Sequence, residues 1–273
     1  MNSEPNHQDK ILERFTATAD VFAESVRTMR VEESHRLVEL ATAGLTLHSE
    51  SLAHSESLAI DVACGPGTFT RPFASRVRRA VGVDLTPAMI EKARAEAARV
   101  GIANIEFICG DIYALPFTDG VASIVACGYA FHHMQEPARA LSEMARVLRP
   151  GGRIAIVDIT AAEGAGGALH NKIERVRDPS HTSAQTVPQF HSLIHDAGLR
   201  LLSEDVRLHW YDFDLWMRNA GSAPGDVNYV QVRRMMEEIM SNDISGLNPR
   251  YSEKTGAIEF LHTVLLLVAE KPE

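Results

Sequence analysis

The sequence has 273 residues, with few cysteines, no excess of basic residues and no long apolar run. Its three cysteines, Cys64, Cys109 and Cys127, are an odd number in apolar, strand-like runs, which favours reduced core thiols over a disulfide framework. The longest apolar run, 263–269, is far shorter than the roughly 20 residues of a membrane-spanning helix. We therefore expect a buried strand there and no membrane span.

The charge of the chain argues against nucleic acid as a partner. There are 27 Lys and Arg against 36 Asp and Glu, a net charge of −9, whereas duplex-binding proteins usually carry a basic footprint. The only dense basic cluster is 76–79 (RVRR), which we expect to be a solvated face. The polar residues 1–7 lack the apolar core of a signal peptide, which predicts a cytoplasmic protein.

The pattern of apolar residues changes at Leu58. From there, short apolar runs alternate with helical stretches, which is typical of a parallel sheet with crossover helices. The predicted strands are 58–63, 80–84, 105–109, 121–127, 153–159, 199–209 and 263–271. The predicted helices are 34–43, one opened by Thr86-Pro87 and ended by Gly101, one opened by Glu136-Pro137 and ended by 149–152, 188–197 and 230–240. Residues 48–57, rich in Ser and His, predict a loop.

Three carboxylates fall at the ends of three consecutive predicted strands. They are Asp61, Asp84 and Asp111, and they converge on the edge of the sheet where such folds bind ligands. The first strand runs into a glycine turn at 61–68 (DVACGPGT), which lets the backbone approach a ligand. This signal alone is weak, because dinucleotide-binding folds also use it, although Thr70 stands here in place of their third glycine.

Four motifs in order resemble the class I S-adenosylmethionine-dependent methyltransferases, in the branch typified by the ubiquinone and menaquinone biosynthesis C-methyltransferases. They are 61–70, 83–89, 110–117 and 146–153, and the match continues through 131–134 (FHHM). The resemblance covers about 58 to 160. It implies S-adenosylmethionine as cofactor and a Rossmann-like α/β fold, with a seven-stranded, mostly parallel sheet, an antiparallel last strand and helices on both faces.

The remaining segments are expected to surround that core. Residues 1–57 are predicted to form an N-terminal helical extension or lid, and 58–273 the methyltransferase domain. Within the latter, substrate-covering segments are expected near 160–196 and 210–262, the second being an insertion between the last two strands. The aromatic cluster 210–216 either shapes a pocket for a flat substrate or packs in the core.

The cofactor-binding prediction combines the three carboxylates with their neighbours. Asp61 is expected to face a cationic amino group, Asp84 the ribose hydroxyls and Asp111 the adenine amine, with Met89 packed under the adenine edge and Phe22 in the lid. For Cys64 and Cys127, the alternative to cofactor binding is packing in the core. The predicted residues are Asp61, Ala63, Cys64, Gly65, Gly67, Asp84, Leu85, Met89, Asp111, Ile112, Cys127 and Phe22.

The predicted catalytic residues are histidines, although a base is optional because the cofactor already carries an excellent leaving group. His132 and His133 follow the fourth strand, and we favour His133 as the base and His132 as structural. His181 ends the phrase 177–181 (RDPSH), which either lines the substrate mouth or forms a local turn. No metal site is predicted, because the i, i+4 pair His191 and His195 lies beside the apolar stripe of its helix.

We therefore predict an enzyme that methylates an O, N or C nucleophile of a small molecule. The alternative within this class is a quinone-biosynthesis C-methyltransferase. A nicotinamide-dependent oxidoreductase is disfavoured by Thr70, Asp111 and the turn 150–152, and a non-catalytic S-adenosylmethionine-binding regulator or scaffold remains an alternative. The predicted partner is a small-molecule substrate, with no nucleic acid and no membrane span, and a homodimer is left open.

Overall fold

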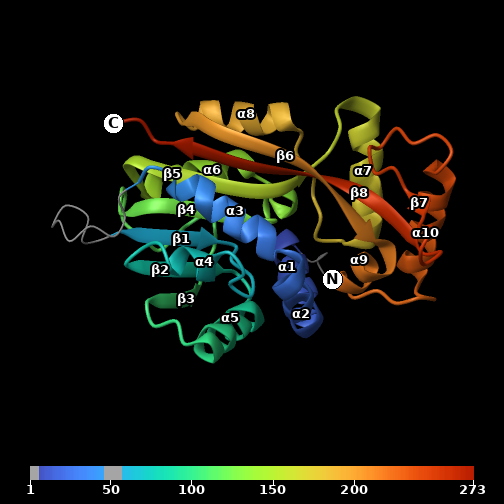
Figure 1. Ribbon diagram of the computed structural model, residues 1–273, viewed down its shortest axis with the longest axis horizontal. Helices are drawn as coiled ribbons and strands as arrows, with labels where there is room; N and C mark the ends of the chain where they lie inside the picture. Colours follow the sequence, from blue (N-terminus) through green and yellow to red (C-terminus); the bar gives the residue numbers. More distant parts are fainter. Residues whose placement is uncertain (1–5, 46–56) are drawn as a thin grey trace.

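The computed structural model describes residues 6–45 and 57–273. The predicted loop at 48–57 therefore lies outside the described residues, apart from Ser57. The described strands form one sheet in the order β3-β2-β1-β4-β5-β8-β6, with β7 paired to β8 (Figure 1). Their bounds are β1 Leu58–Val62, β2 Arg79–Asp84, β3 Ile105–Cys109, β4 Ala122–Gly128, β5 Leu148–Thr160, β6 Arg200–Asp212, β7 Arg250–Tyr251 and β8 Ile258–Glu270.

The sheet confirms the expected α/β class. Strands β1 to β5 pair in parallel, and β8 lies antiparallel between β5 and β6. The sheet has eight strands where seven were predicted, because the two residues of β7 also pair with β8, where Ser252 N–H donates to Ala257 O at 2.8 Å and closes the connection.

Helices cover both faces of the sheet (Figure 1). Successive residues of β1 face opposite sides, so that Ile60 packs in one cluster with α6 and α8 while Ala59 packs in another with α3 and α4. The described helices are α1 His7–Ala17, α2 Ala19–Met29, α3 Val31–Thr42, α4 Thr70–Ala74, α5 Pro87–Val100, η2 Phe131–His133, α6 Pro137–Val147, α7 Gly164–Arg177, α8 Val187–Asp196, α9 Phe213–Asn219 and α10 Val227–Ile239.

Most predicted boundaries fall within a few residues of the observed ones, with three informative exceptions. The turn 149–152, predicted to precede the fifth strand, is part of β5, because Gly151 N–H donates to Lys271 O and Lys271 N–H donates to Gly152 O. Strands β6 and β8 extend beyond their predicted limits, since they form one antiparallel ladder from Arg200↔Glu270 to Asp212↔Glu259. Helix α7 begins in a glycine-rich stretch for which the sequence predicts no helix.

The three N-terminal helices pack against different parts of the fold. α3 packs against β5 and β8, where Leu37 and Ala41 are fully buried in the core. α1 and α2 instead pack against α5, and α2 also packs against α9. The C-terminal end of β6 and the N-terminal end of β8 form a separate apolar cluster with α7, α9 and α10, which contains Phe213 and Phe260. These segments lie beside the carboxyl end of the sheet (Figure 1).

The cysteines and tryptophans divide between core and surface. Cys64 and Cys127 are buried, but Cys109 is exposed, so our prediction of a core thiol there is wrong; Cys109 ends the edge strand β3. Trp210 is 46% exposed whereas Trp216 is buried in the cluster of α9. None of the helices in the described ranges is both long and apolar enough to span a membrane.

Candidate active site

A cavity of about 580 Å³ opens at the carboxyl ends of β1 to β4. Its floor comes from the segments 63–66, 84–86, 110–113 and 128–130, which follow these four strands. Its cover comes from α1 and α2, which contribute Phe15 and Phe22 among others, with the two rings edge to face at 5.5 Å. The cavity therefore lies at the edge where the sequence predicts the cofactor.

Asp84 is held at the cavity by the backbone around it. Gly65 N–H donates to Asp84 Oδ2 at 2.7 Å, and Thr86 N–H donates to Asp84 Oδ1 at 2.8 Å. Burial raises the pKa of this carboxyl, against the effect of the two N–H donors. Each carboxylate oxygen keeps a second lone pair, so Asp84 can still accept a ligand hydroxyl on either oxygen.

Asp111 ties the loop after β3 to the N-terminal cover. Its Oδ1 accepts the backbone N–H of Tyr113 at 2.9 Å, and its Oδ2 accepts Gln8 Nε2 of α1 at 2.9 Å. Ala63, Cys64, Gly65, Leu85, Met89, Ile112 and Phe22 also line the cavity. The structure thus brings most of the predicted cofactor residues together.

Three predicted cofactor residues do not line the cavity: Asp61, Gly67 and Cys127. Asp61 is buried and accepts the hydroxyl of Thr70 at 2.5 Å, which gives the residue at the third-glycine position a structural role. A Cβ on Gly67 would lie 2.8 Å from the ring of Phe107, so this glycine is required by packing.

The buried carboxyl of Asp61 should make the stability of the ligand-free protein depend on pH. Burial raises its pKa to about 7, although the Thr70 hydrogen bond lowers it. Between the ordinary value of 3.8 and about 7, the folded state binds more protons than the unfolded state, so stability should fall as pH rises through this range. Asp61→Asn should remove that fall. Thermal unfolding midpoints at pH 5 and pH 8 test it: an equal pH dependence in the variant and the wild type would contradict this.

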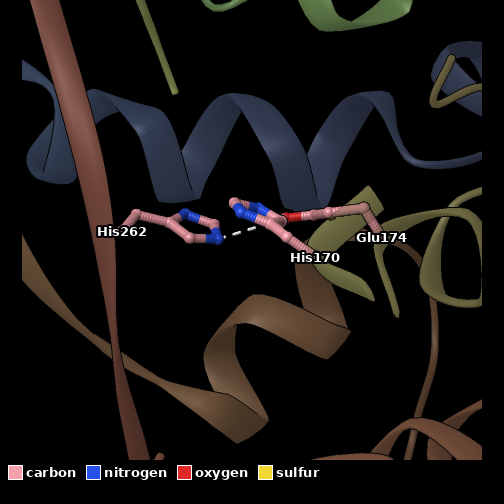
Figure 2. Close-up of side chains that lie close together, drawn as sticks. All are labelled: His170, Glu174 and His262. Atoms are coloured by element: carbon pink, nitrogen blue, oxygen red, sulfur yellow. Dashed lines mark ion pairs between the residues drawn. The ribbon is translucent and has the colours of Figure 1, made fainter. Parts of the chain in front are cut away.

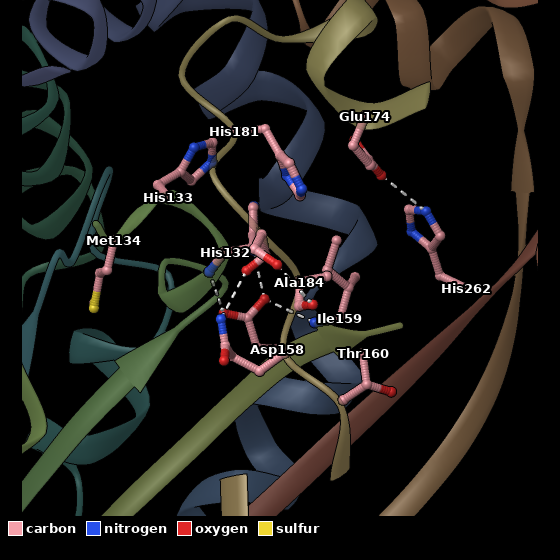
Figure 3. Close-up of polar contacts among 12 residues, drawn as sticks. His132, His133, Met134, Asp158, Ile159, Thr160, Glu174, His181, Ala184 and His262 are labelled. Carbon is pink, nitrogen blue, oxygen red and sulfur yellow. Dashed lines mark hydrogen bonds and ion pairs between the residues drawn. The ribbon is translucent and has the colours of Figure 1, made fainter. Parts of the chain in front are cut away.

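His132 is oriented by a buried carboxylate. Its Nδ1 lies 2.5 Å from Asp158 Oδ1, and its backbone N–H donates to Asp158 Oδ2 at 3.3 Å (Figure 3). The side chain of Asp158 is 1% exposed and that of His132 is 13% exposed. Burial lowers the pKa of His132, but Asp158 outweighs it and the pKa is raised. With Nδ1–H donating to Asp158, Nε2 is the basic atom of a ring that lines the cavity.

His133 also lines the cavity but has a different environment. Its Nδ1 lies 3.0 Å from the carbonyl oxygen of Ser180, to which it donates, because the Ser180 hydroxyl donates to Asp178. Burial and the neighbouring His132 lower the pKa of His133 to about 3. The ring also packs edge to face on Phe15. His133 is therefore neutral at pH 7.

His181 lies behind these two rings, not at the cavity surface. Its Nε2 lies 2.8 Å from Asn171 Oδ1, and its ring stacks on His132 at a centroid distance of 5.5 Å. Burial lowers its pKa to about 2. In the segment 177–181, Asp178 Oδ1 accepts the backbone N–H and the hydroxyl of Ser180, as in the predicted local turn.

Sequence reasoning missed two groups at this site. Asp158 stands alone as a carboxylate in a buried apolar strand, and this was the available signal for a partner of His132. Arg14 of α1 donates to Asp178 at 2.9 Å and to Asn219 O at 2.6 Å, and it thereby fastens the cover of the cavity. No local pattern marks Arg14. Of the predicted solvated pair, His195 is exposed and the side chain of His191 is 41% exposed.

The comparisons with known proteins agree with this geometry. Residues 60–156 match the methyltransferase domain family. The chain is 31% identical over 176 residues to the uncharacterized methyltransferase YcgJ of Bacillus subtilis, an alignment that covers 63% of this chain and 68% of that one. This chain belongs to the class I methyltransferase family. The resemblance seen in the sequence is thereby confirmed.

The similarity to other methyltransferases extends to solved structures. The crystal structure of YcgJ has a TM-score of 0.77 at 26% identity, covering 89% of this chain and 99% of that one. The demethylmenaquinone methyltransferase of Deinococcus radiodurans is 36% identical over 124 residues, which cover 44% of this methyltransferase and 51% of the relative. The aligned part of this second relative is thus about half its length.

Proposed function

We propose that this methyltransferase moves a methyl group from S-adenosylmethionine to an oxygen, nitrogen or carbon atom of a small-molecule acceptor. The cofactor end of the cavity fits that ligand. Asp84 and Asp111 line it, and the hydroxyl of Thr68, which also lines it, is buried with no hydrogen-bond partner among the described residues. Buried polar atoms of this kind call for a ligand.

Asp84 is proposed to accept the ribose hydroxyls. Asp84→Ala should weaken S-adenosylmethionine binding by about 1–3 kcal/mol, because the ribose hydroxyls would be buried without their acceptor. Calorimetric titration with S-adenosylmethionine and its demethylated product measures this. Asp119→Ala is the matched control, since that carboxylate is 80% exposed and pairs with Arg146. Unchanged affinity in Asp84→Ala would remove Asp84 from the ribose role.

The chain's own task is to position the acceptor and exclude water. S-adenosylmethionine supplies an electrophilic methyl group on a good leaving group, so positioning supplies much of the catalysis. We assign the role of lid to α1 and α2, whose Phe15 and Phe22 cover the cavity. Segments 160–196 and 210–262 are proposed to cover the acceptor, because Asp178, Tyr211 and Trp216 line the cavity from that side.

The observation that carries the mechanism is the His132–Asp158 pair. A base must be neutral and must keep a free lone pair, and its pKa works best near the working pH. Neutral His132 keeps a free lone pair at Nε2, and Asp158 raises its pKa, which makes it the stronger base, whereas the pKa of His133, lowered to about 3, makes it a weak base. We therefore propose His132 as the proton acceptor in place of His133, and we assign His133 and His181 to packing and positioning.

The acceptor is proposed to be a small molecule with an ionisable O–H, N–H or C–H bond. One specific alternative is a quinol, favoured by the similarity to demethylmenaquinone methyltransferase. A quinol is distinguished from other small-molecule acceptors by assaying demethylmenaquinol beside a panel of phenols, amines and enolisable acids with methyl-labelled S-adenosylmethionine. Cofactor binding with no transfer to any of them would favour a non-catalytic regulator instead.

A further inference from the structure

Three buried side chains, separate from the His132–Asp158 pair, converge on one point. His170 and Glu174 lie one turn apart on α7, and His262 reaches them from β8 (Figure 2). Glu174 Oε1 lies 3.1 Å from His262 Nε2 and 3.8 Å from His170 Nε2, and the three atoms lie within 4.8 Å of one another. Each of the three side chains is at most 3% exposed.

These three atoms lack ordinary partners. Across residues 6–45 and 57–273, the Nε2 atoms of both histidines and Oε1 of Glu174 make no hydrogen bond of normal geometry, and their only polar contacts are the ion-pair contacts with one another. Buried polar atoms without partners are rare in folded proteins, because desolvation is then uncompensated. Three of them facing each other call for one group that all three can bind.

The donor set and the spacing fit a metal ion. Imidazole nitrogen and carboxylate oxygen bind zinc at about 2.0–2.2 Å, so that neighbouring ligands of a tetrahedral site lie roughly 3.4 Å apart. The two distances from Glu174 Oε1 to the histidines, 3.1 Å and 3.8 Å, lie on either side of this value. The spacing of His170 and Glu174, four residues apart on one helix face, is also that of helical metal ligands.

A second layer of contacts orients the carboxylate. Arg177 Nη1 donates to Glu174 Oε2 at 3.1 Å, while Arg177 Nε and Nη2 donate to the carbonyl of Trp216 at 3.1 Å and 3.0 Å. Arg177 therefore occupies the oxygen that faces away and leaves Oε1 directed at the histidines. Outer partners of this kind are a regular feature of metal sites.

We propose that His170, Glu174 and His262 bind one divalent transition-metal ion of the zinc class. Glu174 and His262 line the same cavity as His132 (Figure 3), so an open coordination position faces the acceptor end. An oxygen or nitrogen of the acceptor can occupy that position. Metal binding itself does not rest on the proposed methyl transfer.

The test is a calorimetric titration of chelator-treated full-length protein with Zn²⁺, with Co²⁺ and its visible absorption as a second probe. The wild type should bind one ion per chain. His170→Ala and His262→Ala should each weaken binding by at least about 100-fold, the upper range for losing even an outer-layer partner. His191→Ala is the matched control, because that histidine is exposed and pairs with Glu204, and it should bind as the wild type does.

Two further readouts keep this test decisive. S-adenosylmethionine affinity and the unfolding midpoint report whether the variants fold. If a variant does not fold, the Co²⁺ spectrum of the wild type provides the test in its place, because intense visible bands mark tetrahedral coordination. Absence of saturable binding to the wild type, or equal affinity in His170→Ala, His262→Ala and His191→Ala, would overturn the metal site. If the wild type binds the metal but transfers no methyl group to any acceptor tested, the proposed function fails and the metal site stands.

Discussion

His132→Ala is expected to lower kcat by roughly 10²- to 10⁴-fold, the usual contribution of a positioned general base. Its affinity for S-adenosylmethionine should stay within about twofold, because Asp84 ends β2 and Asp111 follows β3, whereas His132 lies in η2 after β4. Initial rates with methyl-labelled cofactor and the identified acceptor give kcat, and calorimetry gives the affinity. His191→Ala, exposed on α8, serves as the control.

Asp158→Asn separates a base from a merely structural histidine. His132 accepts a proton only when neutral, so activity should rise with pH through its pKa. Asp158 raises that pKa by stabilising the imidazolium, and its loss should move the acid side of the pH–rate profile to lower pH while reducing the maximum rate. A profile that falls in height without moving would speak against His132 as the base.

The part of the cavity proposed to hold the cofactor was predictable because its signals are local. The strands β1 to β4 are short apolar runs, and Gly101, with a φ of +73°, ends α5 as its sequence predicts. The expected position of Asp84 at the cavity also follows from strand order alone, since parallel strands bring their carboxyl ends to one edge. Asp61 is the limit of such reasoning: its direction depends on Thr70, which no strand pattern reveals.

The part of the cavity proposed to hold the acceptor was not predictable because its contacts join distant segments. His132 meets Asp158 only after β4 and β5 pair, and Glu174 of α7 meets His262 of β8 only once the folded chain brings these two elements together. A single sequence shows each of these residues but not which one it will face. The same reason explains the choice of His133 over His132, since the two adjacent rings differ only in their long-range partners.

The cover over the cavity depends on a contact of the same long-range kind. Arg14 of α1 and Asp178 after α7 form an ion pair with side chains only 9% and 3% exposed. The second guanidinium contact, to Asn219 O, joins α1 to the end of α9. One side chain therefore links the N-terminal helices to both segments proposed to cover the acceptor.

Arg14→Ala should loosen this cover. Removing one partner of a buried ion pair costs roughly 3–5 kcal/mol, and Asp178 keeps its bonds to Ser180, so we expect about 3 kcal/mol. Because α1 is a peripheral element, the loss should appear as local opening, with amide exchange in α1 faster by about 10²-fold and β4 unchanged. Hydrogen exchange measures it, with the exposed Arg27→Ala as control. Wild-type exchange in α1 would show that Arg14 does not hold the lid, whereas faster exchange with a raised KM for the acceptor would tie lid closure to substrate binding.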